Sequence, residues 1–363
     1  MQPLTNVVRR RYAHVPWLYR VYLRPGERHL RRVQGYWRMR RAATVSLEDY
    51  RARVPLGELE EFVACTLCGE TRQQPLYEPR APDGGWRYRV VRCPGCGFLY
   101  RNPNIRPERL RDLYATGYSR FLTGRYAQNR QRRYQAAMDA VAPIFEDGTG
   151  RRLLDFGCGS GLFLELAEEL GFVCSGVDLS PDSIDQARQR LEHSTVKVGS
   201  PTDIDEVADG FDLITMWSVL AHLPRPVDDL SMLRNRLAPQ GVLVIFTVNA
   251  GSLLLASRGS AWSGFTRNHL MFYGRDTLPR LLAKAGFAAV GFASFYGEDL
   301  ASGTSALSPG EVVRLKQRID ATDGGNMLIA VGFATVSAVD AWGGGLTEVR
   351  RLPQPAPGAK RHP

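Results

Sequence analysis

The sequence lacks any long hydrophobic run. No apolar stretch in its 363 residues approaches the roughly 18 residues that a membrane-spanning helix needs. The N-terminus is rich in arginine and lacks both the compact apolar segment and the small-residue cleavage site of a secretory signal. We therefore expect a cytoplasmic protein. Peripheral contact with a membrane surface stays open as an alternative.

Cysteine is also scarce, with six residues, and we find no internal repeat. So few cysteines in a cytoplasmic chain of this size argue against a disulfide framework, because the cytosol keeps thiols reduced. The composition, with 44% hydrophobic and 23% charged residues and a mean hydropathy of −0.24, is that of an ordinary folded soluble protein. The length allows one full α/β domain and one or two smaller units.

Positive charge is concentrated at one end of the chain. Residues 1–50 hold 11 arginines and three acidic residues, which gives +8 of the formal net charge of +10. Tyrosine and tryptophan are interleaved with these arginines. Three interpretations of this basic segment (1–60) stay open: a solvated arm or helix packed on its own protein, a nucleic-acid arm, and a helix on an anionic membrane.

Four of the six cysteines form two C-x2-C pairs, separated by 24 residues. Each pair can give two thiolates to one tetrahedral ion, and a glycine follows each pair where the backbone must turn. The spacing predicts a structural zinc site in a small ribbon-like unit over 61–103, because four protein ligands leave no open position for catalysis. The predicted ligands are Cys65, Cys68, Cys93 and Cys96.

The rest of the chain alternates between helical and strand-like patterns. Apolar positions at three- and four-residue intervals predict a helical bridge over 104–148. Short apolar runs then alternate with amphipathic helices near 161–170, 183–191, 227–237 and 277–285, which is typical of βαβ units and a mostly parallel sheet over 149–338. We expect 326–334 to add a late strand at an antiparallel edge, and the proline-rich segment 339–363 to be disordered.

One strand in this pattern ends in a glycine-rich turn. In LLDFGCGSG the strand runs through Asp155 into Gly157, Gly159 and Gly161, and a helix follows at once. Glycines allow a tight turn and close approach of a ligand to the backbone. Asp178 ends a second strand 17 residues after Gly161, where an acid can accept hydrogen bonds from a ribose diol. Nicotinamide enzymes share this layout, so the glycine turn alone does not identify the class of cofactor.

The run D-F-G-C-G-S-G resembles the D/E-x-G-x-G-x-G motif of Rossmann-like methyltransferases that use S-adenosylmethionine (SAM). The segments FDLITMWSVLAHLPRP, LRNRLAPQGVLVIFTVN and HLMFYGRDTLPRLLAKAGF are similar to later blocks of that family, so the resemblance covers about residues 150–335. It implies a doubly wound, seven-stranded sheet and a SAM site. The cofactor-binding residues that it implies are Asp155, Gly157, Gly159, Gly161, Asp178, Leu179, Asp203, Met216 and Trp217.

Two histidines are candidates for the general base that a hydroxyl acceptor requires, since the pKa of an unperturbed imidazole, about 6.5, lies near neutrality. His222 follows the fourth strand, where many relatives carry Glu-His, but this chain has Ala221 in place of the glutamate. His269 is the second candidate. For each we also consider a structural role, and Trp262 and Tyr273 are candidate walls of an acceptor pocket.

These features predict a SAM-dependent methyltransferase that acts on a small molecule, with O-methylation favoured. The cysteine unit resembles one that precedes the methyltransferase domain in bacterial enzymes acting on sugars, lipid-linked glycans and secondary metabolites, so the acceptor classes include these. An RNA methyltransferase that uses the basic segment is one alternative, although no N/D-P-P-Y/F motif is present. A non-enzymatic scaffold that retains the fold is the other. The sequence gives no indication of an oligomeric state.

Overall fold

The computed structural model describes residues 43–81, 83–114, 124–199, 210–293, 317, 324–342 and 346–353. Most of the basic segment and the candidate adenine ligand Asp203 therefore lie outside the described residues. Within the described part, no helix is long and apolar enough to cross a membrane.

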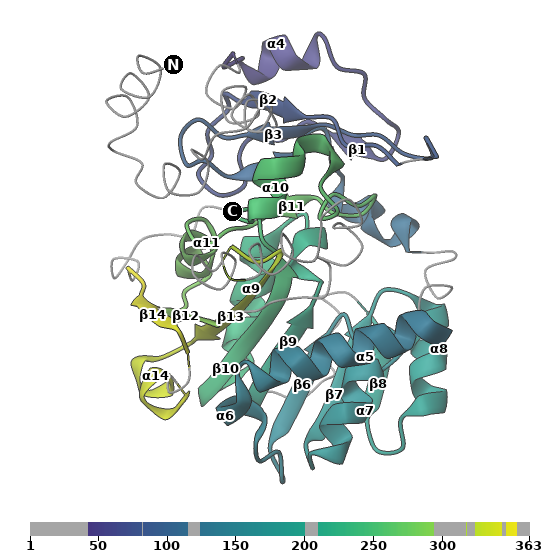
Figure 1. The fold of residues 1–363 in the computed structure, drawn as a ribbon, viewed down its shortest axis with the longest axis vertical. Coiled ribbons are helices and arrows are strands. Elements are labelled where there is room, and N and C mark those ends of the chain that lie inside the picture. Colours follow the sequence, from purple (N-terminus) through teal and green to yellow (C-terminus); the bar gives the residue numbers. More distant parts are fainter. Residues whose placement is uncertain are drawn as a thin grey trace.

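A central sheet of eight strands forms the larger part of the described structure (Figure 1). Its strand order is β14-β12-β13-β10-β9-β6-β7-β8. The strands from β8 to β10 are parallel, whereas β13 is antiparallel to both β10 and β12. The bounds are β6 Arg152–Phe156, β7 Val173–Asp178, β8 Thr195–Val198, β9 Phe211–Trp217, β10 Leu237–Val248, β12 Ala289–Ala293, β13 Met327–Phe333 and β14 Glu348–Arg351.

The strand order reverses direction at β6. From β6 the chain winds outward through β7 and β8, and it then returns to the other side of β6 to add β9 and β10. In an open α/β sheet, ligands bind in the crevice at such a switch point, outside the carboxyl ends of the strands. This topology confirms the predicted doubly wound, mostly parallel α/β fold.

The sheet corrects two predictions about its far edge. The strand predicted over 326–334 is β13, but it lies inside the sheet, and every residue of it is buried. An apolar strand buried on both faces suits an interior position. Of the segment predicted to be disordered (339–363), the described residues instead contribute the end of α14 (Val336–Trp342) and an eighth strand, β14, whereas residues 354–363 lie outside the described part.

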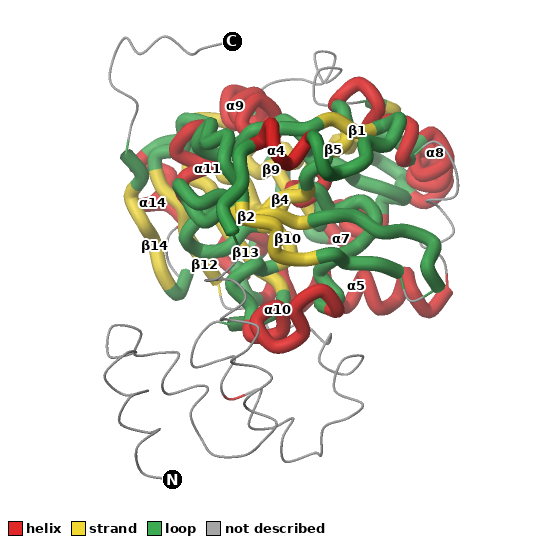
Figure 2. The backbone as a smooth tube through the Cα atoms, turned by 90° about the horizontal axis from the view of Figure 1, so that it is seen from above, coloured by secondary structure: helices red, strands yellow, loops and turns green. Residues whose placement is uncertain are grey.

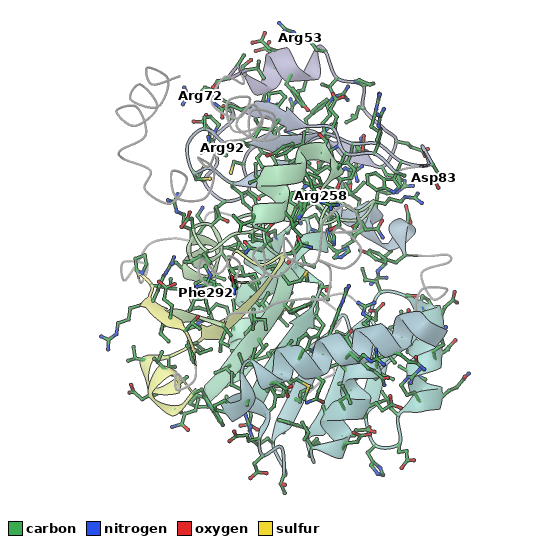
Figure 3. All side chains as sticks on the ribbon, in the orientation of Figure 1. Arg53, Arg72, Asp83, Arg92, Arg258 and Phe292 are labelled. Atoms are coloured by element: carbon green, nitrogen blue, oxygen red, sulfur yellow. The ribbon has the colours of Figure 1, made fainter. Side chains whose placement is uncertain are left out.

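The charged side chains of β14 explain why its sequence does not resemble a strand. Phe292 of β12 is labelled in Figure 3. Arg350 of β14 and Arg275 each place a guanidinium over its ring, at 5.4 and 4.7 Å from the centroid, and both pair with Glu348. An edge strand tolerates charges of this kind because one of its sides faces water.

Helices cover both faces of the sheet. One apolar cluster joins the sheet to α5, α6, α7, α8 and α14, and the other joins it to α9 and α11. Figure 1 shows α5 lying across the face formed by β6 and β7. The bounds are α5 Gly124–Asp139, α6 Ala142–Phe145, α7 Leu162–Glu169, α8 Pro181–Arg190, α9 Pro226–Asn235 and α11 Leu278–Lys284.

The cysteine-containing segment folds into a second, smaller unit at one end of the central sheet, and Figure 2 looks down onto it. Its four-stranded sheet has the order β11-β4-β3-β2, and β1 pairs separately with β5. Neighbouring residues of β3, Val90 and Val91, join the two different apolar clusters, so the unit packs into both. Its elements are α4 Leu47–Arg51, β1 Glu60–Glu61, β2 Gln74–Tyr77, β3 Val90–Arg92, β4 Leu99–Arg101, β5 Asn104–Ile105 and β11 Met271–Phe272.

Four further short helices lie in the connections between these elements. One 3-10 helix, η1, precedes α5, and a second, η4, follows β9 directly. The helices α10 and η5 lie between β10 and β11 in the sequence. The bounds are η1 Pro107–Leu113, η4 Leu220–His222, α10 Leu253–Arg258 and η5 Gly259–Ala261.

Candidate active site

The turn between β6 and α7 is built on glycines in the left-handed region. Gly157 has a φ of +81°, and a Cβ atom there would lie 2.3 Å from Cγ2 of Val219, so only glycine fits without displacement. Gly161 has a φ of +77° and caps the N-terminus of α7. The amide of Gly157 donates to the carbonyl of Val177 (2.8 Å), which ties the turn to β7.

Asp178 at the end of β7 faces this turn. Its Oδ2 accepts a hydrogen bond from the amide of Gly159 (2.9 Å), and its Oδ1 accepts one from the amide of Ser180 (2.9 Å). Burial raises the pKa of Asp178, whereas these amides and the charge of Arg130 oppose the rise. The glycine turn and the acid of the second strand thus lie at hydrogen-bonding distance, as the ribose-binding interpretation requires.

Asp155 lies beneath the turn rather than in the pocket. It is 1% exposed, and its Oδ1 accepts a hydrogen bond from Oγ1 of Thr215 on the neighbouring strand β9 (2.7 Å). Burial raises the pKa of Asp155 to about 7, and the nearby Asp178 adds to the rise. Its side chain therefore links β6 to β9 at the switch point.

A pocket of about 790 Å³, part of it open to solvent, extends from the glycine turn along the ends of β6, β7 and β9. Its lining joins four groups of residues from different parts of the sequence: the turn and β7, the residue after β8, the segment from the end of β9 to Leu223, and the η1–α5 region. The lining residues are Leu110, Tyr114, Arg130, Tyr134, Phe156, Gly157, Cys158, Gly159, Ser160, Leu162, Val177, Asp178, Leu179, Gly199, Trp217, Ser218, Val219, His222 and Leu223.

The two cofactor candidates at the end of β9, Met216 and Trp217, lie on opposite faces of the strand. Trp217 lines the pocket and packs against Phe163 (4.8 Å between ring centroids) and Tyr134 (5.1 Å). Met216 does not line the pocket and is buried in the apolar cluster of α9 and α11. Adjacent strand residues point to opposite faces, so only one of the two can reach the ligand side. Gly161 also lies outside the lining, and a Cβ atom there would lie 2.9 Å from Cδ1 of Leu191, the residue that follows α8.

His222 in η4 lines the pocket beside a tyrosine. Its Nδ1 lies 2.7 Å from the hydroxyl of Tyr114. Burial lowers the pKa of His222 well below the ordinary imidazole value, and the neighbouring His269 and Arg130 lower it further. The imidazole is therefore neutral at physiological pH, which is the state that a proton acceptor needs.

His269 lies directly behind His222. The two rings meet edge to face with 4.8 Å between centroids, and His269 Nδ1 donates to the carbonyl of Gly264 (2.6 Å). Burial lowers the pKa of His269 to about 4. His269 does not line the pocket, and neither do the acceptor-wall candidates Trp262 and Tyr273, which are buried in the protein core.

The structure adds pocket residues that the sequence analysis did not single out. Tyr114 follows η1, and Arg130 and Tyr134 lie on α5, all within the predicted helical bridge. Arg130 donates from Nε to the Tyr134 hydroxyl (2.9 Å). Ser218 has a φ of +61°, which is uncommon for a residue other than glycine and recurs at functional sites. No local sequence motif marks these residues, because their proximity to the turn arises from the tertiary fold.

The four cysteines of the smaller unit form one cluster. Their Sγ atoms all lie within 4.8 Å of one another. The two pairs have the same backbone turn: the amide of Cys65 donates to Glu70 and that of Gly69 to Cys65, while Cys93 donates to Phe98 and Gly97 to Cys93. Both glycines have a φ of +78°. Four converging thiols on two matched turns suit a tetrahedral metal ion.

Comparison with known proteins gives a family match over somewhat less than half of the chain. Residues 126–291 match the family described as "Methyltransferase domain". A ubiquinone biosynthesis O-methyltransferase from Cereibacter sphaeroides is 34% identical over 39% of this chain and 62% of its own length. A mitochondrial one from Schizosaccharomyces pombe is 31% identical over 31% of this chain and 44% of its own. The chain thus spans about half the length of the curated relatives that it matches.

Solved structures of SAM-dependent methyltransferases are also similar. One from Mesorhizobium loti (18% identity, TM-score 0.42) covers 54% of this chain and 97% of its own, and one from Archaeoglobus fulgidus (23%, 0.42) covers 59% and 96%. The assignment of the fold rests on the strand order rather than on these scores. Residues 126–291 thus match a methyltransferase domain, and the strand order and the glycine turn show that this part of the chain has a Rossmann-like fold.

Proposed function

We propose that this chain transfers the methyl group of SAM to a hydroxyl group of a small molecule. The observation that carries the proposal is a single pocket that joins the glycine turn and Asp178 to the His222–Tyr114 pair. One end of the pocket suits the cofactor and the other end suits an acceptor whose proton must be removed.

At the cofactor end, Asp178 accepts hydrogen bonds from the ribose diol, and the backbone of Gly157 and Gly159 contacts the methionine part. Arg130, which lines the same pocket, supplies a guanidinium for the methionine carboxylate. Leu179 packs on the adenine. Trp217 forms a wall of the cofactor site, and Asp203, outside the described residues, accepts from the adenine amino group.

At the acceptor end, the chain's own residues hold and move one proton. SAM, when bound, supplies an electrophilic methyl sulfonium, so the protein needs to orient the acceptor in line and activate its oxygen. Tyr114 and His222 act as a pair: the acceptor's hydroxyl proton passes to the phenol oxygen of Tyr114 while the phenol's own proton passes to Nδ1 of His222. The low pKa of His222 keeps Nδ1 available for this transfer at neutral pH.

The acceptor end is aromatic and apolar, with Tyr114, Tyr134, Leu110 and Leu223 in its lining. This lining supports a compact acceptor with an aromatic or otherwise apolar body. The relatives named as O-methyltransferases of ubiquinone biosynthesis support transfer to oxygen. Sugars, glycolipids and secondary metabolites stay among the acceptor classes to be tested. The RNA alternative depended on the basic segment, most of which lies outside the described residues.

We further propose that the cysteine cluster holds one zinc ion in a structural role. Cys65, Cys68, Cys93 and Cys96 would fill all four positions of a tetrahedral ion, which leaves none for substrate. The ion would close two turns of a unit whose strands are only two to four residues long. The metal content of the purified protein tests this proposal, and less than one equivalent of tightly bound zinc would contradict it.

Label transfer tests the proposed reaction. The full chain is incubated with methyl-labelled SAM and, separately, with a panel of catechols, phenols and sugars and with a cell extract fractionated into small molecules, glycolipids, RNA and protein. We expect label in a phenolic or other hydroxylated small molecule. Label that is confined to RNA and removed by nuclease would contradict the proposal and establish the RNA alternative.

A further inference from the structure

The last strand of the smaller unit's sheet comes from the methyltransferase domain. β11 follows β10 in the sequence, yet it pairs with β4, Met271 opposite Tyr100 and Phe272 opposite Leu99. Figure 1 shows β11 and α10 beneath β2 and β3, between the unit and the central sheet. The unit is therefore completed by the same loop that carries His269.

Two backbone hydrogen bonds extend this connection to the pocket. The amide of Arg101, the last residue of β4, donates to the carbonyl of Leu270 (2.7 Å). The amide of Leu270 donates in turn to the carbonyl of Ala221 (2.7 Å), which directly precedes His222. A continuous path of paired backbone therefore connects β4 with η4.

The side chain of Arg101 makes a second connection. Arg101 is 8% exposed, and its Nη1 donates to the carbonyl of Arg267 (3.2 Å), two residues before His269. Its Nη2 forms an ion pair with Glu60, and its guanidinium lies over the ring of Tyr88, 5.0 Å from the centroid. A planar guanidinium can make these contacts at once because its donors point in several fixed directions.

The cysteine turns fix the start of this path. Cys93 and Cys96 lie in the turn between β3 and β4, and the amide of Cys93 donates to the carbonyl of Phe98, next to β4 (2.8 Å). From the other turn, Oγ1 of Thr66 lies 3.8 Å from the sulfur of Met271 in β11. The strands that contact the histidine loop are thus held by the two turns that carry the thiols.

We infer that the four-cysteine unit is a positioning element for the acceptor end of the active site, and that Arg101 is the positioning residue through which it holds the His269 loop against His222. The inference rests on the proposed function, since it assigns the unit a role in that site. The groups that face His222 are His269, Tyr114 and Arg130. The cofactor end is formed by β6 and β7 and has none of these contacts with the unit.

The test compares two arginine variants of the full chain. Arg101→Lys keeps the positive charge near Glu60 but cannot reach Glu60 and the Arg267 carbonyl together. Arg89→Ala is the control, because Arg89 is an arginine of the same unit whose side chain forms an ion pair with Glu78 (3.2 Å) instead of with Glu60. Zinc content, calorimetric SAM affinity and NMR titration of the ring signals of His222 and His269 are measured for both variants, for wild type, and for wild type after removal of the metal by a chelator.

We expect Arg101→Lys and metal removal to shift the ring signals of both histidines. Since the buried His222–His269 contact would loosen, the pKa of His222 should rise by about one unit toward the ordinary value. SAM affinity should stay within about threefold of wild type, which also shows that the variant is folded, and Arg89→Ala should resemble wild type in all three measurements.

Unchanged ring signals in both Arg101→Lys and the metal-free protein would overturn the inference. An equal shift in Arg89→Ala would also overturn it, because the effect would then be a general response of the unit. If wild type does not bind SAM, the proposed function fails. This result can be distinguished from a failure of the inference, because the inference is tested by the histidine ring signals, which are measured in every sample.

Discussion

The two ends of the pocket are built in different ways. The cofactor end comes from one short stretch of chain, the β6–α7 turn and the end of β7, in which Gly159 and Asp178 are 19 residues apart and hydrogen-bonded. The acceptor end combines Tyr114, Tyr134 and His222 from three separate segments, with His269 behind His222. A local site of the first kind is shared across a fold family, whereas one assembled from distant segments can change with each substrate.

The largest effect that separates the two ends should come from His222. His222→Asn, or Tyr114→Phe, should reduce methyl transfer by about 10²–10⁴-fold, because each removes one partner of the proton-accepting pair. SAM affinity should change little in either variant. Measurement of kcat with the acceptor found by label transfer and of SAM affinity by calorimetry checks this. A loss of SAM binding in Tyr114→Phe would show that the two ends are not separable.

A second effect should appear in the pH dependence of stability, through Asp155 at the cofactor end. Its folded-state pKa of about 7 is above the value of about 3.9 in the unfolded chain, so the folded state retains the proton longer. The free energy of unfolding should therefore fall as pH rises from about 4 to about 7, by up to about 4 kcal/mol from this group, and then level off.

Asp155→Asn should remove the contribution of Asp155 to the pH dependence of the free energy of unfolding. The asparagine keeps an oxygen that can accept a hydrogen bond from Thr215. Burial also raises the pKa of Asp229 to about 7, so Asp229 contributes to the pH dependence in both proteins. The quantity to compare is therefore the difference in the free energy of unfolding between variant and wild type at each pH. Denaturant unfolding at several pH values provides it. Equal slopes in the two proteins would show that Asp155 is ionised within the fold.

A smaller effect should follow from Gly157→Ala. The added Cβ would contact Val219 at 2.3 Å and would be held at a φ of +81°, so the turn must shift. We expect about a tenfold loss of SAM affinity, with a strain of about 1–3 kcal/mol. Gly150→Ala is the control, because Gly150 also has a positive φ, +72°, but has open space around it and lies outside the pocket. Equal SAM affinity in the two variants would argue against contact between the turn and the cofactor.

The same contrast explains what the sequence could predict. The strand–turn–helix pattern at Asp155–Gly161 and the acid at Asp178 are local, and the structure places the turn and the acid together. The choice between Met216 and Trp217 depends on which face of β9 meets the ligand, which a strand buried at every position but one does not reveal. Tyr114 and Arg130 lie in a helical region with no motif, and β14 is too charged to resemble a strand. The partnership of β4 with β11 joins segments about 170 residues apart, which no local pattern can encode.

Calorimetric titration of SAM into wild type, Asp178→Ala and Asp182→Ala tests the central claim most directly. Asp182 is an exposed acid in the first turn of α8, four residues from Asp178 and outside the pocket, so it controls for the loss of a charge in the same region. We expect one SAM per chain for wild type and for Asp182→Ala, and a loss of about 100-fold or more in affinity for Asp178→Ala, because the ribose loses its hydrogen-bond acceptor in a buried site. Equal affinity in all three proteins would contradict the assignment of this pocket to the cofactor.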